Sequence, residues 1–181
     1  MPHTSSGFGG GKVILLGEHA VVHGTSAIAA GLRRGVTATV RVAVRDTLRI
    51  EPWARTVEPD AKSEDPLCRA FAAILGGYRS RPPLRAEVVV GLPPGAGLGC
   101  SAAIAVSLVD AIDAALGIKR SRAEVAEEAL RWERVFHGTP SGIDNAIAAL
   151  GGLIRFERPH GPSRLASARP LHLVVAESGE R

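Results

Sequence analysis

The sequence predicts one α+β domain over residues 1–181. The first half holds short apolar or alternating segments that are typical of strands, and from residue 101 onward apolar residues recur at helical spacing. Hydrophobic residues make up 45% of the chain and charged residues 22%, which is enough to bury a core and excludes a disordered or low-complexity chain. Strands followed by helices are the pattern of an α+β fold.

The charge is nearly balanced, with 22 Lys and Arg against 18 Asp and Glu and a net charge of +4. The arginines are scattered, with Arg33 and Arg34 as a basic pair near other charges, so a solvated surface is favoured over a nucleic-acid footprint, and the charge also suits phosphate-bearing small molecules. Cys68 and Cys100 cannot form a disulfide framework, and no zinc-binding spacing occurs. With no signal peptide and no apolar segment of membrane-spanning length, we expect a cytoplasmic protein without a membrane partner.

The first half is expected to form strands joined by loops. After a Ser- and Gly-rich lead at 4–11, the apolar run 12–16 predicts a strand. Residues 36–44 alternate with a period of two, which predicts a strand with one buried face that pairs with a second strand at 47–51. Residues 52–66 contain three prolines and several charges and are expected to form a loop.

The second half is expected to be mainly helical. Pro66 suits the first turn of a helix, Gly117 suits a helix C-cap, and residues 121–124 match a capping box. The expected helices are 66–75, 101–116, 122–136 and 143–150, and the expected strands are 85–90, 153–157 and 171–176.

The segment 91–103 joins a strand to a helix through four glycines in nine residues. Glycines let the backbone approach a ligand closely, and the first turn of the following helix offers free N–H groups, so the segment suits an anion. Ser101 would then lie where a metal-bound phosphate sits. A tight turn that needs glycine only for packing remains the alternative.

Two familiar phosphate-binding patterns are excluded. The Walker pattern requires Ser or Thr after Gly-Lys, but Val13 follows Gly11-Lys12. The dinucleotide pattern requires glycine three residues after Gly97, where Cys100 stands. Neither a P-loop nor a Rossmann fold is therefore expected.

Two carboxylates flank a second Gly- and Pro-containing break at 138–142. Glu133 lies late on one predicted helix, and Asp144 lies in the first turn of the next. One could hold Mg²⁺ while the other orients or deprotonates a hydroxyl group, as phosphoryl transfer requires. Taken singly, Asp144 also suits a helix dipole and Glu133 a solvated helix face.

A third polar group follows the strand at 12–16. Glu18 and His19 come directly after this strand, where binding sites are often built. Zinc binding by His19 and His23 is disfavoured, because the order of residues is not HExxH and no third ligand is evident. Lys12 by itself could be a surface cation.

Together the three segments 12–24, 93–103 and 137–145 resemble the mevalonate kinases of the GHMP kinase superfamily. The Glu-His-Ala-Val-Val-His-Gly continuation at 18–24 distinguishes the chain from galactokinase-like and homoserine-kinase-like relatives. The resemblance implies the GHMP N-terminal fold, which is similar to the second domain of ribosomal protein S5. It also implies ATP-dependent phosphorylation of mevalonate, with ATP and Mg²⁺ as cofactors.

The resemblance implies a role for each matching residue. Asp144 and Lys12 match the catalytic pair that acts on the substrate hydroxyl, and Ser101 and Glu133 match the Mg²⁺ ligands. The residues that match the mevalonate pocket are Lys12, Glu18, His19, Ser141 and Asp144. The residues that match the ATP phosphate loop are Pro94, Gly95, Ala96, Gly97, Leu98, Gly99, Cys100, Ser101 and Ala102.

The chain departs from the family pattern in three ways. Cys100 stands where Ser is usual, and Gly9-Gly10-Gly11 stands where Ala-Pro-Gly is usual. Family members also carry a C-terminal domain with a third Gly-rich motif, which is expected to be absent here. We expect the uncovered apolar face to favour aggregation or a homodimer. The alternatives are a GHMP kinase for another small alcohol and an inactive nucleotide-binding fragment.

Overall fold

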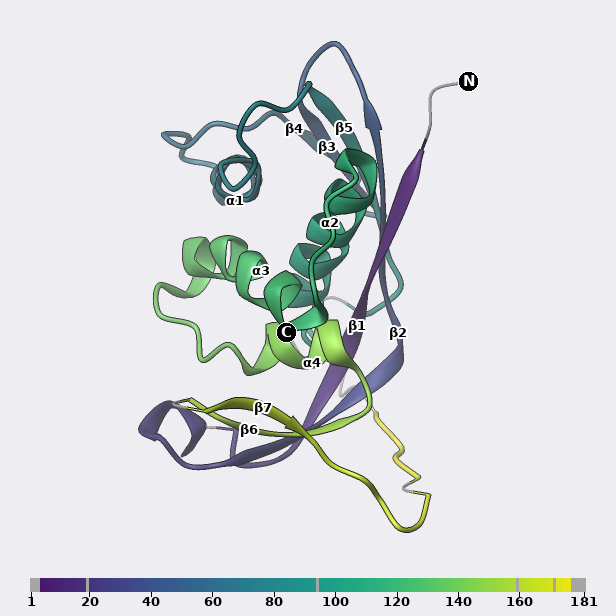
Figure 1. The fold of residues 1–181 in the computed structure, drawn as a ribbon, viewed down its shortest axis with the longest axis vertical. Coiled ribbons are helices and arrows are strands. Elements are labelled where there is room, and N and C mark those ends of the chain that lie inside the picture. The colour runs from purple at the N-terminus through teal and green to yellow at the C-terminus, as the bar shows by residue number, and fades with distance from the viewer. Residues whose placement is uncertain (1–3, 19, 94, 159, 171, 177–181) are drawn as a thin grey trace.

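The computed structural model describes residues 4–18, 20–93, 95–158, 160–170 and 172–176. In these residues a seven-stranded sheet is covered on one side by helices α1 to α4 (Figure 1). The strands are β1 (Ser5–Leu16), β2 (Ala27–Val42), β3 (Thr47–Glu51), β4 (Arg55–Val57), β5 (Leu84–Val90), β6 (Leu153–Glu157) and β7 (Gly161–Arg164). The helices are α1 (Pro66–Leu75), α2 (Cys100–Leu116), α3 (Arg122–His137), α4 (Ile143–Leu150) and the short 3₁₀ turn η1 (Ala20–His23).

The long strand β2 organises the sheet. Its whole length pairs antiparallel with β1, its C-terminal part with β5 and its N-terminal part with β6. The sheet order is β4-β3-β5-β2-β6-β7, with β1 pairing β2 outside this path. This mixed arrangement, with helices on one side, confirms the α+β prediction.

The strand predicted at 12–16 is longer than expected, because the glycine-rich lead from Ser5 onward belongs to it. Its backbone pairs with β2 from Ser5 onward. A Cβ at Gly7 would overlap the Ser107 carbonyl group, and one at Gly9 would overlap the Ala103 carbonyl group. Glycine therefore lets α2 lie directly on β1. Because glycine has a low strand propensity, the same residues do not predict a strand from the sequence.

The predicted pairing of 36–44 with 47–51 is wrong. Strand β5 lies between β2 and β3, and β3 runs parallel to β5 and antiparallel to β4. Asp46 explains this topology, because its carboxylate accepts bonds from Leu84 N at 2.8 Å and from Arg81 Nη1 at 2.6 Å. These contacts tie the connection after β2 to the start of β5.

Three smaller predictions are also corrected. The expected loop at 52–66 contains the short strand β4, and β7 was not anticipated because its Gly-Pro-Ser-Arg sequence has no strand pattern. The expected strand at 171–176 is not formed: residues 172–176 have no regular structure, and Leu171 lies outside the described residues. Val174 is almost fully exposed.

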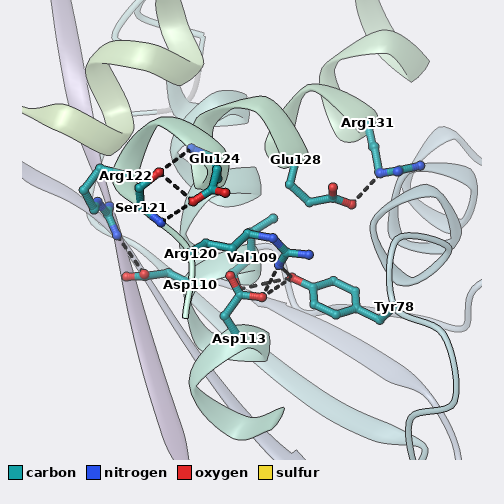
Figure 2. Close-up of polar contacts among 10 residues, drawn as sticks. All are labelled: Tyr78, Val109, Asp110, Asp113, Arg120, Ser121, Arg122, Glu124, Glu128 and Arg131. Carbon is teal, nitrogen blue, oxygen red and sulfur yellow. Dashed lines mark hydrogen bonds and ion pairs between the residues drawn. The ribbon is translucent and has the colours of Figure 1, made fainter. Parts of the chain in front are cut away.

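The helices agree closely with the prediction. Asp65 caps α1 through a bond from Leu67 N, and Pro66 occupies the first turn. The capping box of α3 is present, with Ser121 and Glu124 bonded to each other's backbone N–H groups. Figure 2 shows this cap beside a buried polar cluster of Tyr78, Asp113 and Arg120, which links the segment after α1 to α2 and to the start of α3.

Candidate active site

The loop between β5 and α2 forms a glycine-lined turn. Gly95, Gly97 and Gly99 have φ values of 79°, 69° and 72°, in the left-handed region that favours glycine. Gly99 is the N-cap of α2 and offers no side-chain cap. The first N–H groups of this 17-residue helix therefore remain available to an anion at its positive end.

Lys12 and Asp144 meet beside this loop. Lys12 Nζ lies 3.3 Å from Asp144 Oδ1, and the side chain of Lys12 is only 7% exposed. Asp144 Oδ1 is itself buried, and apart from the Lys12 ammonium group no described residue contacts it as a donor. A carboxylate oxygen has two lone pairs, so this oxygen can also accept a hydrogen bond from a ligand hydroxyl group.

Ser101 and Glu133 form a second polar pair. Ser101, in the first turn of α2, donates to Glu133 Oε1 on α3 at 2.5 Å and accepts from Trp132 Nε1 at 3.1 Å. Burial raises the pKa of Glu133, which the Ser101 bond and His137 only partly offset. His137 Nε2 lies 3.6 Å from Glu133 Oε2.

Both pairs line one cavity of about 470 Å³, together with the glycine loop. This volume is within the range of small-molecule sites. Beyond the polar pairs the wall is apolar and includes Trp53, Leu67, Ile104, Trp132 and Phe136. The cavity thus combines two polar pairs and a glycine-rich loop with apolar side chains.

Sequence reasoning missed the apolar wall. The rings of Trp132 and Phe136 lie 5.7 Å apart, and their i,i+4 spacing on α3 resembles ordinary core packing. Trp53 lies in a Pro-containing segment and is 37% exposed. In the sequence, the signal for this apolar wall is a tryptophan within a segment that is expected to form a loop.

Some predicted residues lie elsewhere. Glu18 is exposed and is not among the cavity-lining residues, and Ser141 accepts a 3.4 Å bond from Ile143 N beside a smaller hollow. Ala96 lines a separate hollow behind the loop. His19 and Pro94 lie outside the described residues.

The remaining predicted loop residues lie at the cavity. Leu98, Cys100 and Ala102 all line it. Burial raises the pKa of the Cys100 thiol, so this residue behaves as an apolar wall group rather than a thiolate.

Within the described ranges, no group of three or more His, Cys, Asp and Glu side chains could hold a metal ion without help from a ligand. None of the described helices is long and apolar enough to span a membrane.

Comparisons with known proteins show which proteins this chain resembles. Residues 66–152 match the family of the GHMP kinases N terminal domain. The chain is 33% identical to the mevalonate kinase of Aeropyrum pernix, over 93% of this chain and 56% of that protein. It is 33% identical to the mevalonate kinase of Mus musculus, over 82% of this chain and 52% of that protein.

Solved structures show the same fold. The L. major mevalonate kinase in complex with R-mevalonate has a TM-score of 0.69 at 32% identity, over 89% of this chain and 51% of that one. The Methanococcus jannaschii mevalonate kinase has a TM-score of 0.76 at 19% identity, over 92% and 56%. The chain spans about half the length of the curated relatives it matches. Over residues 66–152 the chain therefore matches the GHMP kinases N terminal domain, and it shares its fold with mevalonate kinases.

Proposed function

We propose that this domain serves ATP-dependent phosphorylation of mevalonate to 5-phosphomevalonate. The observation that carries the proposal is the convergence of Lys12, Asp144, Ser101 and Glu133 on one cavity beside the glycine loop. Relatives at 30% identity or more that are named mevalonate kinases support this substrate. The chain spans about half the length of those proteins, so their activity is a proposal for this domain.

ATP is proposed to bind along the length of the cavity. Its phosphates would lie against the loop Gly95–Gly99 and the N-terminus of α2, where N–H groups and the helix dipole favour negative charge. The apolar wall suits the adenine base, since aromatic rings stack on flat heterocycles. The phosphates would thereby point toward Lys12 and Asp144.

Asp144 is proposed as the group that accepts the proton of the substrate hydroxyl. Its buried Oδ1, whose one partner among the described residues is the Lys12 ammonium group, can accept that hydrogen bond. The Lys12 ammonium group beside it would stabilise negative charge as it develops on the attacking oxygen. Positioning and charge stabilisation are the main contributions that phosphoryl transfer requires from a protein.

Ser101 and Glu133 are proposed as the Mg²⁺ ligands. Their donor atoms are hard oxygens in contact with each other, and Glu133 is almost fully buried with no Lys or Arg partner among the described ion pairs, so the pair fits a divalent cation. Mg²⁺ bound there would neutralise phosphate charge. With phosphate oxygens completing the coordination, two protein ligands suffice.

Glu18, His19 and Ser141 are proposed as mevalonate contacts. Ser141 lies in the loop that leads to Asp144, and among the described residues its hydroxyl group accepts the long bond from Ile143 N at 3.4 Å. A homodimer and a cytoplasmic location stay predictions from the sequence.

The test is a substrate panel. The chain is incubated with Mg-ATP and mevalonate, galactose, homoserine or phosphomevalonate, and ADP release is measured alongside calorimetric binding of each alcohol in the presence of a non-hydrolysable ATP analogue. We expect binding and turnover only with mevalonate. Preference for another alcohol would favour a different GHMP kinase, and ATP binding without binding of any alcohol would favour a nucleotide-binding module.

A further inference from the structure

Strand β1 contains an irregularity immediately before Lys12. Ser5, Gly7 and Gly9 are buried on the side of β1 that faces α2, so strict alternation would place Gly11 on that side and turn Lys12 away. The register with β2 shifts between Gly10 and Lys12. Gly10 pairs with Gly35 but Lys12 pairs with Gly31, so β2 holds two more residues than β1 across this step, a bulge that interrupts the regular pairing. Beyond it the Lys12 side chain lies on the helix side, where it pairs with Asp144.

The redirected residue is held by the phosphate loop. Lys12 N donates to the Leu98 carbonyl group at 2.9 Å, so the backbone of β1 is fixed to the loop. A Cβ on Gly99 would lie 2.6 Å from Lys12 Cγ, 3.4 Å from Cε and 3.6 Å from Cδ. The aliphatic stem of Lys12 therefore runs across the bare Cα of Gly99.

We propose that Gly99 is a positioning residue for Lys12: the missing side chain at Gly99 leaves the passage through which the Lys12 stem reaches Asp144. The expected effect on kcat rests on the proposed function, whereas the expected displacement of Lys12 does not. The clash falls on Cγ, near the root of a buried side chain, so a methyl group at Gly99 must displace the whole stem. Displacement of the stem moves Nζ away from Asp144.

The loop supplies matched controls. Gly95 and Gly97 also have positive φ, and a Cβ at either would meet nothing within 4 Å. Gly95→Ala and Gly97→Ala therefore impose the same kind of backbone strain near the phosphates without the contact to Lys12. Any excess effect of Gly99→Ala over Gly97→Ala reports on Lys12.

The structural test is a double-mutant cycle on the chain without any ligand. Urea unfolding is measured for Gly99→Ala and Gly97→Ala, each alone and combined with Lys12→Ala, which removes Cγ. We expect Gly99→Ala to be the more destabilising change with Lys12 present, and the two changes to be equal once Lys12 is alanine. An excess that persists without Lys12 overturns the proposal.

The kinetic test uses only single variants, so it holds even where Lys12→Ala does not fold. We expect Gly99→Ala and Gly97→Ala to weaken ATP binding alike, while the kcat of Gly99→Ala falls further, on the order of a hundredfold. Equal kcat values for the two variants overturn the proposal. A chain that phosphorylates no alcohol contradicts the proposed function instead, and the unfolding cycle then decides the role of Gly99 by itself.

Discussion

Lys12 and Asp144 form an ion pair of 3.3 Å across 132 residues of sequence, between a strand and the first turn of α4. Lys12 is almost completely buried, whereas the Asp144 side chain is 35% exposed and lines the cavity. The cation is thus enclosed by the protein while the carboxylate remains accessible to a ligand. This asymmetry suits a carboxylate that contacts a ligand hydroxyl group while a fixed positive charge lies beside it.

The first prediction concerns Asp144→Asn. The amide cannot accept the substrate proton, so we expect kcat for mevalonate to fall by orders of magnitude while ATP affinity changes little. Steady-state kinetics and calorimetric titration with ATP measure the two quantities. Asp60→Asn, an exposed carboxylate outside the cavity, serves as the control. Near-normal turnover of Asp144→Asn would remove this residue from the catalytic role.

The second prediction concerns the metal. Glu133→Gln keeps the size of the side chain and its bond to Ser101 but removes the negative charge, so we expect a higher Mg²⁺ concentration for half-maximal activity. The matched control is Glu127→Gln on the same helix, where an exposed glutamate pairs weakly with Arg134 at 3.8 Å. If both variants keep the parent's Mg²⁺ dependence, Glu133 is not a metal ligand.

The helices could be predicted from sequence because their signals are local. Asp65 before Pro66, Ser121 with Glu124, and the glycine that follows each helix fix the ends of α1 to α4 within a residue or two. The pairing of the strands was harder to predict from the sequence. Strand β5 pairs with both β2 and β3, and Asp46 contacts Arg81 and Leu84 beside it, although these residues are more than 30 positions apart in sequence.

The polar half of the site could be recognised because its residues lie in motifs. The contact between Ser101 and Glu133 agrees with their expected shared role, although that role itself stays a prediction. The apolar half could not be recognised, since Leu67 and Ile104 belong to helices whose other apolar residues form the core. Nothing in a periodic pattern distinguishes a residue facing a cavity from one facing the interior.

The third prediction is a pH dependence of stability. Burial acts to raise the pKa of Asp46, but the bonds from Arg81 and Leu84 N and the charge of Arg81 outweigh it and lower the pKa. A lowered pKa contributes stability that is present above the unfolded-state value, about 3.9, and is lost as pH falls through the folded-state value. We expect Asp46→Asn to cost ~2 kcal/mol at pH 7 and progressively less below pH ~4.

Urea unfolding of the parent and of Asp46→Asn across this pH range measures the difference. The exposed Asp60→Asn variant should show no comparable gap, which separates a specific ion pair from the general effect of net charge. A gap between the parent and Asp46→Asn that stays constant from pH 7 to pH 3 would contradict the assignment.

The fourth prediction concerns the buried cluster in Figure 2. Tyr78 donates to Asp113 Oδ1 at 2.9 Å and accepts from Arg120 Nη1 at 3.1 Å, while the Arg120 guanidinium lies 5.0 Å from the Tyr78 ring centre. Tyr78→Phe keeps the ring and removes the hydroxyl group, so Asp113 loses one hydrogen-bond donor. Asp113 Oδ2 already has no partner among the described residues. We expect a loss of ~1–2 kcal/mol in unfolding free energy, because hydrogen bonds to a buried charge are costly to remove.

The matched comparison is Arg122→Gln, which breaks the neighbouring but part-exposed pair with Asp110 at 2.7 Å. Solvent screens this second pair, so its loss should cost less than ~1 kcal/mol. Chemical unfolding followed by tryptophan fluorescence gives both values, since Trp132 is buried in the same helical layer. If Tyr78→Phe proves no more destabilising than Arg122→Gln, the hydrogen bonds of the Tyr78 hydroxyl group contribute little to the free energy of unfolding. The cluster would then connect α1 to α2 and α3 through packing of the Tyr78 ring alone.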